Sequence, residues 1–388
     1  MSRFDRMTVK GFRRLLDLDL ALNPLTVVIG ANGVGKSSLL DVFSLLSASA
    51  SGGLNQRLTD FGGLGAVLTL DHADSLTLGL SMEAVEGAPL EYTLRLASRG
   101  QSYGIESEIL SQQKNITPPP FYHIQARFDD IRYYDVGEKA IKKQGAGVKP
   151  TWVHNAQESA LAQVPRMFQL PESFRNALSS SRYFHALNVS PRSPVRLPQP
   201  MFPAKHPGSD GENLVSCLYT LRETDPERFG EIEATLQTAF PGFGGMQFPP
   251  AAAGMLSLSW KDRNFTRPLY AHQLSEGTLR FLWLTTLLYS SEPSRMILLD
   301  EPEVSLHPEW LNLLGHLLRD ASRRSQILVA THSDRLVGYL KPEEVVIMDI
   351  DEEGMTTATP AEQLDLAHWL TDYSLDELWR MGVLGGRS

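Results

Sequence analysis

Apolar and polar positions alternate with period two through much of the first third of the chain. Residues 3–22 alternate loosely and predict two antiparallel strands joined at 10–12. Further alternating segments, separated by turn residues, predict an antiparallel meander; they are 67–70, 76–82, 90–96, 121–128 and 131–136. Between these two regions, the stretch 47–65 is rich in Ser and Gly and predicts a mobile loop.

Apolar spacing becomes helical in the middle of the chain, at 157–180, 211–223 and 226–239. The connection 190–208 carries six prolines. Because proline interrupts both helices and strands, this connection predicts irregular structure. A linker on the surface of a lobe is favoured over a loop that contacts a partner or DNA.

From residue 254 onward, strand patterns alternate with helical ones. The expected strands are 255–260, 296–299, 327–330 and 345–348, and the expected helices are 276–289 and 308–321. Such alternation predicts a parallel sheet covered by helices.

Composition narrows the class of protein. The chain has 388 residues, 42% hydrophobic and 21% charged, which is ordinary for a globular protein with a large core. No apolar run is long enough to span a bilayer, and the N-terminus lacks a signal-peptide pattern, so a cytoplasmic protein without membrane contact is expected. The single cysteine, Cys217, excludes an intramolecular disulfide and a Cys-based zinc site, and is expected to be a core residue. A net charge of −9 argues against bulk electrostatic binding of nucleic acid.

The strongest chemical signal is a glycine-rich loop between an apolar strand at 25–29 and a helix. Residues 30–37 match G-x-x-x-x-G-K-[ST] in full, in the strand–loop–helix context that this motif requires. Its backbone N–H groups would face the phosphates of a nucleotide. Lys36 would reach the β- and γ-phosphates, and the Ser37 hydroxyl would hold Mg²⁺. The nucleotide-contacting residues are expected to be Gly30, Asn32, Gly33, Gly35, Lys36, Ser37 and Ser38.

Two further strand ends carry catalytic candidates. Asp300 would support Mg²⁺, directly or through water, and Glu301 would orient or deprotonate the attacking water. His332, just past the next buried strand, could sense or polarise the γ-phosphate. Because ligands of parallel sheets bind beyond the carboxyl ends of strands, the ends at Gly30, Asp300 and His332 are expected to meet at one edge. The acids Asp349, Asp351, Glu352 and Glu353 are interpreted as a solvated turn rather than a metal cluster.

The segment 273–278 (QLSEGT) leads directly into a helix. Ser275, Glu276 and Gly277 are suited to holding a phosphate at the helix N-terminus. One chain already has a P-loop for that purpose, so this second anion site favours a homodimer in which each segment completes the other chain's site. Taken alone, the segment could equally be an ordinary N-cap.

Together these motifs resemble the ABC-type ATPase heads of the RecF, SMC and OLD group. In that family's terms, 30–37 is similar to Walker A, 274–278 to the signature motif, 298–301 to Walker B, 303–308 to the D-loop, and His332 to the switch histidine. Segments 210–214 and 378–386 further resemble the ATPases of bacterial phage-defence operons. The resemblance implies ATP and Mg²⁺ as cofactors and a homodimer, with higher oligomers open, that sandwiches two ATP molecules.

The implied fold class is α/β: a P-loop NTPase of the ABC-ATPase head type with an antiparallel β subdomain and a mostly helical insertion. Its expected parts are an N-terminal half-head, a helical lobe, a C-terminal half-head and an extension, at 1–137, 138–250, 251–350 and 351–388. The chain departs from transporter subunits at Glu276 and Thr278 and in its insertion. A glutamine loop is not placed, with Gln56, Gln101 and Gln125 as candidates.

Two functions remain open. The first is an ATPase that regulates a separately encoded effector, such as a nuclease, in anti-phage defence; the stretch after His332 is too short for the nuclease domain of OLD proteins. The second is a RecF-like repair ATPase that binds double-stranded DNA. Its candidate contacts are Lys139, Lys142, Lys143 and Lys149, whose plain interpretation is a solvated basic loop. A transporter subunit and a catalytically inactive binding module are both disfavoured.

Overall fold

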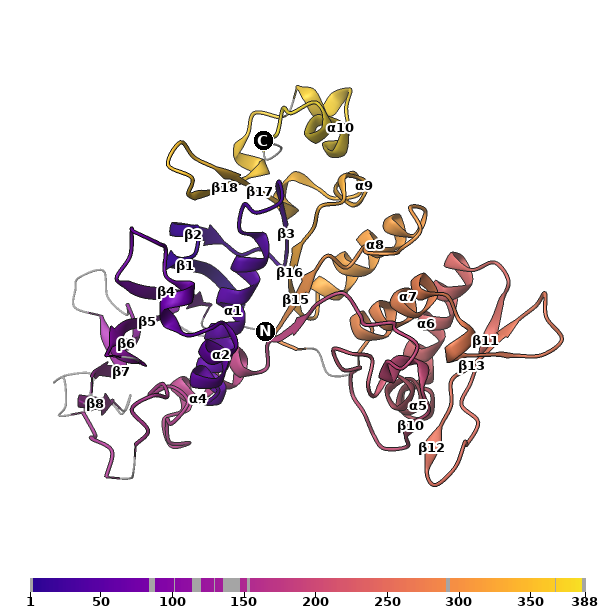
Figure 1. Ribbon diagram of the computed structural model, residues 1–388, viewed down its shortest axis with the longest axis horizontal. Coiled ribbons are helices and arrows are strands. Elements are labelled where there is room, and N and C mark those ends of the chain that lie inside the picture. Colours follow the sequence, from indigo (N-terminus) through magenta and orange to yellow (C-terminus); the bar gives the residue numbers. More distant parts are fainter. Residues whose placement is uncertain are drawn as a thin grey trace. The chain divides into compact units, whose positions relative to one another are not determined.

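The computed structural model describes residues 3–83, 88–100, 102–113, 120–128, 130–134, 147–151, 154–290, 294–366 and 368–385. The chain forms two compact units, each assembled from separate stretches of sequence (Figure 1). The P-loop unit comprises Met1–Arg182, Glu343–Asp365 and Leu384–Ser388, and the signature unit comprises Tyr183–Pro342 and Leu366–Val383.

A seven-stranded antiparallel sheet forms one layer of the P-loop unit, in the order β2-β1-β4-β5-β6-β7-β8. Its strands are β1 (Phe4–Phe12), β2 (Leu15–Ala21), β4 (Ser75–Met82), β5 (Leu90–Arg99), β6 (Ser102–Gln112), β7 (Phe121–Arg127) and β8 (Asp130–Tyr133). An antiparallel meander is confirmed, although β6 was not among the expected strands. The turn between the first two strands lies at 13–14 rather than at 10–12. The strand expected at 67–70 is wrong, because Val67 ends a helix and Leu70 is exposed.

Helices pack against this sheet: α1 (Lys36–Ser51), α2 (Leu54–Asp60), α3 (Leu64–Val67) and α4 (Gln169–Ser179). The mobile loop predicted at 47–65 is therefore wrong. Gly52, in the left-handed conformation, ends α1, and the next helix buries Leu54 and Leu58 one turn apart. The serines of this stretch lie within α1, and Gly52, Gly53 and Gly63 occupy cap positions of the three helices. The helix expected at 157–180 forms only in its second half.

A buried carboxyl group joins the meander to the segment before α4. Glu108 on β6 is fully buried and accepts hydrogen bonds from the backbone N–H groups of Ala160 and Leu161 at 2.6 and 2.8 Å. The Tyr92 hydroxyl donates a third, at 3.0 Å. Burial nevertheless raises the pKa of Glu108 to about 7.

The P-loop strand β3 (Leu25–Ile29) pairs in parallel with β17 (Val345–Ile350), and β18 (Thr356–Pro360) adds an antiparallel strand outside β17. All five residues of β3 are buried, as its continuous apolar sequence predicts. The acids between β17 and β18 form a hairpin turn, in which the Asp351 carboxylate accepts from the N–H groups of Glu353 and Met355. The interpretation of this segment as a turn is confirmed.

In the signature unit, β15 (Met296–Asp300) and β16 (Gln326–Ala330) run parallel, as predicted, and β9 (Arg182–Phe184) lies beside β15. Helices α8 (Trp310–Ser322) and α9 (Asp334–Val337) follow the two parallel strands. Register pairs Asp300 with Ala330, so the loops after both strands begin at the same level of the sheet.

The rest of the signature unit is mostly helical, with α5 (Leu214–Thr224), α6 (Pro226–Ala239), α7 (Glu276–Leu288) and α10 (Leu375–Arg380). Small sheets join β11 (Phe243–Gln247), β13 (Ser259–Asp262) and β14 (Leu269–Tyr270), and β10 (Gln199–Pro200) with β12 (Met255–Leu256). The single strand expected at 255–260 is thus two strands. Irregular structure through 190–208 is confirmed, apart from β10 and one short 3-10 turn, Pro194–Arg196. Other short 3-10 segments are Ala271–Gln273, Pro342–Glu344, Ala361–Gln363 and Trp369–Thr371.

Cys217 lies fully buried on α5, and burial raises its pKa to about 12. The interpretation of Cys217 as a core residue is confirmed. Within the described residues, no helix has both the length and the apolar character needed to cross a membrane.

Candidate nucleotide site

Close backbone packing fixes the shape of the P-loop. Gly30 has φ +151°, and a Cβ there would lie 2.3 Å from the carbonyl oxygen of Met348 on β17. Gly35 has φ +105° and faces Thr356 on β18, whose hydroxyl donates to the Val34 carbonyl at 2.7 Å. A side chain at Gly30 is thus excluded by a strand more than three hundred residues away, and not only by its own dihedral angle.

The P-loop lysine lies over its own loop. Lys36 is 4% exposed, and its Nζ donates to the carbonyl oxygens of Gly30 and Ala31, both at 2.8 Å. Helix α1 begins at Lys36, so Ser37 and Ser38 occupy its first turn, where helical N–H groups have no partner inside the helix. Asn32 and Gly33 lie exposed at the tip of the loop. The predicted nucleotide-contacting residues are therefore contiguous in the P-loop unit.

Arg13 is a candidate that the sequence interpretation missed. It lies in the β1–β2 turn with φ +48°, and its guanidinium donates to Ser38 Oγ at 3.2 Å and pairs with Asp41 at 2.7 Å. The turn therefore brings a cation to the first turn of α1. The only signal in the sequence is a pair of arginines at the point where one strand pattern gives way to the next.

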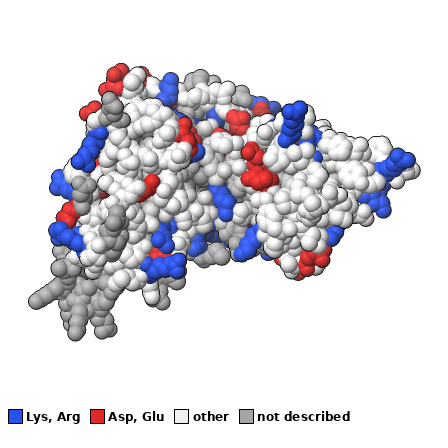
Figure 2. Space-filling view, turned by 60° about the horizontal axis from the view of Figure 1, so that its bottom comes forward, with Lys and Arg blue, Asp and Glu red and all other residues white. Residues whose placement is uncertain are grey.

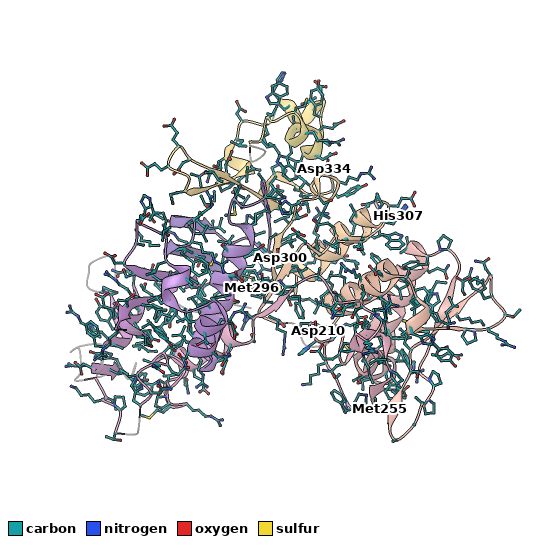
Figure 3. All side chains as sticks on the ribbon, viewed as in Figure 1. Asp210, Met255, Met296, Asp300, His307 and Asp334 are labelled. Carbon is teal, nitrogen blue, oxygen red and sulfur yellow. The ribbon has the colours of Figure 1, made fainter. Side chains whose placement is uncertain are left out.

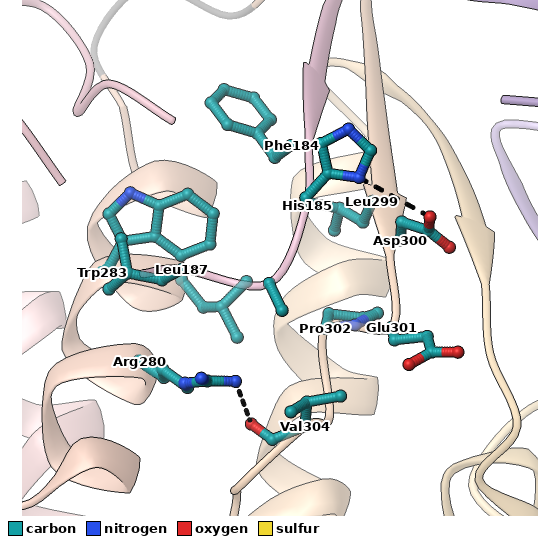
Figure 4. A pocket seen from close by; sticks show the side chains of 12 residues that line it. Phe184, His185, Leu187, Arg280, Trp283, Leu299, Asp300, Glu301, Pro302 and Val304 are labelled. Atoms are coloured by element: carbon teal, nitrogen blue, oxygen red, sulfur yellow. Dashed lines mark hydrogen bonds and ion pairs between the residues drawn. The ribbon is translucent and has the colours of Figure 1, made fainter. Parts of the chain in front are cut away.

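The acidic strand end lies in the signature unit, where Asp300 ends β15 (Figure 3). Its Oδ2 accepts from the Tyr183 hydroxyl at 3.3 Å and lies 3.7 Å from His185 Nδ1 (Figure 4). The rings of Tyr183 and His185 lie 4.2 Å apart. Both residues were missed from the sequence, because β9 is only three residues long and shows no period.

The side chains of Glu301 and His332 lie in contact between the loops that follow β15 and β16. His332 Nε2 lies 3.0 Å from Glu301 Oε1, and both side chains are partly exposed. Glu301 has φ +49°, a conformation that is costly for a non-glycine residue and that recurs at functional sites. Its N–H donates to the Ala330 carbonyl at 2.9 Å, so the strained residue remains anchored to the neighbouring strand. The two predicted catalytic side chains thus lie in contact.

A buried carboxyl group holds these two loops together. Glu303 Oε1 accepts from the Thr331 hydroxyl and, at 3.2 Å, from the backbone N–H of His332. Its other oxygen, Oε2, is buried and has no hydrogen-bond partner among the described residues. Burial raises the pKa of Glu303. Glu303 therefore connects the D-loop-like segment to the backbone that carries the predicted switch histidine.

The signature-like segment forms a regular helix start. Ser275 is the N-cap of α7, and its Oγ accepts from the Thr278 N–H at 3.1 Å, while Glu276 lies in the first turn. A Cβ on Gly277 would lie 2.7 Å from the Ser305 carbonyl oxygen. One turn further along α7, Arg280 donates to the Val304 carbonyl at 3.3 Å (Figure 4). Burial lowers the pKa of Arg280. The segment therefore packs directly on the D-loop-like residues.

The described residues contain no group of three or more His, Cys, Asp or Glu side chains that could hold a metal by themselves. A site of one carboxylate and one hydroxyl fits Mg²⁺ in a nucleotide complex, where phosphates and water supply the other oxygens. Asp300 and Ser37 are donors of that kind, one in each unit. The expected convergence of Gly30 with Asp300 and His332 stays a prediction.

The structure does not identify the glutamine loop or a cluster of the candidate DNA-contacting lysines among the described residues. Gln56 on α2 donates to Asp60, Gln125 lies on β7, and Gln101 falls outside the described residues, so the glutamine loop stays unassigned. Of the four candidate DNA-contacting lysines, Lys149 pairs with Asp130 at 2.7 Å. The other three, Lys139, Lys142 and Lys143, also lie outside the described residues.

Solved structures of similar fold are heads of SMC proteins. An SMC head bound to the C-terminal winged-helix domain of ScpA covers 95% of this chain and 99% of its own, with a TM-score of 0.60 and 13% identity. A Pyrococcus furiosus Smc head with an extended coiled coil, bound to the C-terminal domain of ScpA, covers 98% of both chains, with a TM-score of 0.53 and 13% identity. These likenesses confirm the expected fold class.

Sequence relatives carry more specific names. The OLD nuclease of Thermus scotoductus is 22% identical over 98% of this chain and 67% of its own length. The Septu protein PtuA of Bacillus thuringiensis is 28% identical over 24% of each chain. A family described as "AAA domain, putative AbiEii toxin, Type IV TA system" matches residues 25–338, from the P-loop strand to the end of α9. Because that match takes in most of the sequence, the chain belongs to this AAA-domain family, as an ABC-type ATPase of the RecF, SMC and OLD class, which is linked to anti-phage defence.

Proposed function

We propose that this protein binds ATP with Mg²⁺ and hydrolyses it. The observation that carries the proposal is the contact of Glu301 with His332 at 3.0 Å, next to Asp300 at the end of β15. A carboxylate paired with an imidazole can accept a proton from water and orient it. Glu301 is the proposed general base, and His332 holds its carboxylate and contacts the γ-phosphate.

Nucleotide binding is assigned to the P-loop unit. Lys36 would exchange its two carbonyl contacts for phosphate oxygens, and the first-turn N–H groups of α1 would face the same phosphates. Ser37 and Asp300 are the proposed metal ligands. When bound, the metal ion neutralises charge that develops on the phosphoryl oxygens. Arg13, held at Ser38, is a second cation of this unit suited to the phosphates.

We further propose a homodimer around two ATP molecules. Ser275, Glu276 and Gly277 lie at the start of a 13-residue helix, where backbone N–H groups and the helix dipole favour an anion. Each chain would present this helix start to the nucleotide of its partner. Glu301→Gln, which retains the shape of the side chain but removes the base, should accumulate that dimer when ATP is present.

The output of the dimer is proposed to be control of a separately encoded effector, with a nuclease as the favoured kind. The SMC heads of similar fold are bound to domains of a second protein, ScpA, and one sequence relative is named a nuclease. Anti-phage defence is the proposed setting. Co-expression with the products of neighbouring genes, followed by affinity capture with and without ATP, tests this part. Failure to retain any of them would leave the ATPase without the proposed output.

The test of the core proposal is steady-state ATP hydrolysis by the purified chain, with Lys36→Ala as the blank. Glu301→Gln should lower kcat by about 100-fold or more while ATP still binds, because general-base catalysis contributes about that factor. Glu352→Gln, which makes the same change in the exposed β17–β18 turn, is the matched control and should behave as wild type. Wild-type turnover by Glu301→Gln would remove the assignment.

Duplex DNA added to the same assay separates the regulator from a RecF-like repair ATPase. Strong stimulation of hydrolysis by DNA would favour the repair function, and indifference would favour a protein as the controlled partner. At the described end of the candidate DNA-binding loop, the Lys149 ammonium is already paired with Asp130, so it is a weaker phosphate contact than a free lysine.

A further inference from the structure

The hairpin between β13 and β14 exposes an aromatic ring among cations. Its base is anchored in the core, because Trp260 is buried and packs against Phe240 and Phe243 at centroid distances of 5.3 and 4.4 Å. Its tip, 261–268, lies almost entirely exposed, and the Phe265 side chain is 59% exposed. A rigid base therefore carries a solvent-facing phenyl ring.

Two hydrogen bonds within the turn hold the backbone that carries the exposed Phe265 ring. The Asp262 carboxylate accepts from the Asn264 N–H at 2.8 Å, and the Asp262 carbonyl accepts from the Phe265 N–H at 3.2 Å. Such a turn, closed by an Asp side chain, presets the backbone at the tip. The backbone at the tip therefore loses little conformational entropy when a ligand binds to the ring.

Three exposed cations lie within four residues of Phe265 in the sequence: Lys261, Arg263 and Arg267. Arg263 donates to the Gln237 side-chain carbonyl at 3.0 Å. None of the three pairs with an acid in the part of the chain that the structure describes, whereas the chain as a whole carries a net charge of −9. Figure 2 shows Lys and Arg side chains at the far right of the view, where this hairpin ends.

An open hollow of about 530 Å³ lies along one side of the hairpin, lined by residues that include Phe265, Arg267, Tyr270 and His272. The Tyr270 and His272 rings are nearly parallel, with 6° between their planes. A volume of this size is in the range of ~300–1,000 Å³ that small-molecule sites use, so a nucleobase fits. Flat rings and an arginine along such a hollow suit a ligand that is itself flat and anionic.

We propose that this hairpin binds single-stranded nucleic acid, with bases stacked on Phe265 and in the hollow beside Tyr270, and phosphates held by Lys261, Arg263 and Arg267. Aromatic faces interleaved with cations are the means by which proteins hold unpaired strands without reading their sequence. Three cations are few for duplex binding, which depends mainly on phosphate contacts. A phenyl ring gains more from bases whose faces are open than from a stacked duplex. This strand contact goes beyond ATP hydrolysis and does not require it.

The hairpin leads directly into the signature-like segment. The Tyr270 N–H donates to the Gln273 side-chain carbonyl at 2.9 Å, and Ser275 follows two residues later. A strand bound in the hollow would therefore contact residues next to the N-cap of α7. This places a nucleic-acid contact one short turn from the residues proposed to close the partner's ATP site.

Fluorescence anisotropy with the full chain tests the proposal, without nucleotide. The probes are a labelled single strand of about 20 nucleotides, longer than the ~4–16 nucleotides that such sites cover, and the same sequence as a duplex. Phe265→Ala should weaken single-strand binding by roughly five- to hundred-fold, the usual loss for one stacked base, without changing its salt dependence. Phe265→Tyr should restore it. Lys261→Gln and Arg267→Gln should each lower the slope of log K against log salt by about 0.7.

Matched controls separate this contact from general changes in charge or exposure. Phe202→Ala removes another exposed ring, and Arg323→Gln removes an exposed cation at the C-cap of α8; both should bind as wild type. Equal binding of duplex and single strand, wild-type binding by Phe265→Ala, or Phe265-dependent binding to vesicles of anionic lipid in place of the single strand would each overturn the proposal. ATP hydrolysis measured on the same variants keeps this outcome distinct from that of the proposed ATPase.

Discussion

The two units hold their site residues by different means. In the P-loop unit, the loop is shaped mainly by backbone packing, because Gly30 lies close to the Met348 carbonyl, and the Thr356 hydroxyl adds one hydrogen bond to the Val34 carbonyl. In the signature unit, the loops after β15 and β16 are joined by a side chain, the buried carboxyl of Glu303. A side chain added at Gly30 would clash with the Met348 carbonyl. Loss of the Glu303 carboxyl would remove the hydrogen bonds that join the loops after β15 and β16.

That difference matches the tasks proposed for the two regions. A phosphate cradle works by presenting fixed N–H groups, so rigid backbone packing suits it. The proposed base Glu301 and His332 must shift by small amounts as the reaction proceeds. The Glu303 carboxyl can change its hydrogen bonds to follow them, because its Oε2 has no partner among the described residues. Four substitutions can break or sharpen this comparison.

Gly30→Ala should have the largest effect. The new Cβ would meet the Met348 carbonyl at 2.3 Å at a φ of +151°, so the free energy of unfolding should fall by about 4 kcal/mol from overpacking and backbone strain together. Urea unfolding followed by circular dichroism measures it. Gly65→Ala on α3, where a Cβ would meet nothing within 4 Å, should be near neutral. Equal effects of the two would contradict backbone packing as the basis of the P-loop.

Glu108, a buried carboxyl outside the proposed site, should make the stability of the P-loop unit depend on pH. Its pKa is raised from 4.5 to about 7, so the protonated form stabilises the fold fully below about pH 4.5, and this contribution is lost as the pH rises through 7. The shift corresponds to about 3 kcal/mol in the free energy of unfolding. Glu108→Gln should therefore flatten the fall in stability between pH 5 and pH 8. Glu106→Gln, on the same strand but partly exposed, should leave the fall unchanged, and a flat profile for the wild type would refute the assignment.

Glu303→Ala should lower kcat for ATP by roughly 30-fold, equivalent to ~2 kcal/mol, with little change in KM, because the base and histidine lose their alignment. Thr331→Val removes the hydroxyl donor at constant shape and should act in the same direction, whereas Thr331→Ser should recover most of the activity. Steady-state kinetics separate kcat from KM. A change confined to KM, or no difference between the valine and serine variants, would speak against Glu303 as a positioning residue.

Gly277→Ala should have the smallest effect on stability. The added methyl gains helix propensity of up to ~1 kcal/mol but presses on the Ser305 carbonyl at 2.7 Å. We expect a net change below about 1 kcal/mol and a several-fold loss of hydrolysis. Gly230→Ala on α6, with open space around it, supplies the helix gain alone and should stabilise the protein. Matching behaviour of the two variants would show that the D-loop contact has no role in turnover.

Sequence patterns predicted the strands that are buried along nearly their whole length. Continuous apolar runs identified β3 and β15 because both are buried on two faces. β6 escaped because a bulge opposite Arg95 and Leu96 shifts its period, and its inward residue Glu108 is charged. Local sequence thus predicts a strand only where its pairing is regular and its core face is apolar.

The predicted site residues fall into three short motifs and one separate histidine, His332, because glycine loops and acidic strand ends are visible within a few residues. The supporting side chains could not be found that way. Tyr183 on the three-residue strand β9 and His185 just after that strand contact Asp300, and Thr356 contacts Val34 from 322 residues away. Such contacts are set by tertiary packing, which leaves no period in the local sequence.

The pairing of β3 with β17 and β18 has a consequence for synthesis on the ribosome. The P-loop is translated early, yet the hydroxyl that closes it belongs to a residue made 322 positions later. At about 5–20 residues per second, the nascent chain would carry an unfinished phosphate cradle for roughly 15–65 s. During that interval the edge of β3 is open to other strands, so chaperone dependence and truncation sensitivity should concentrate on the codons for β17 and β18. A frameshift after the catalytic motifs would therefore abolish nucleotide binding through the P-loop, although every motif residue had been translated.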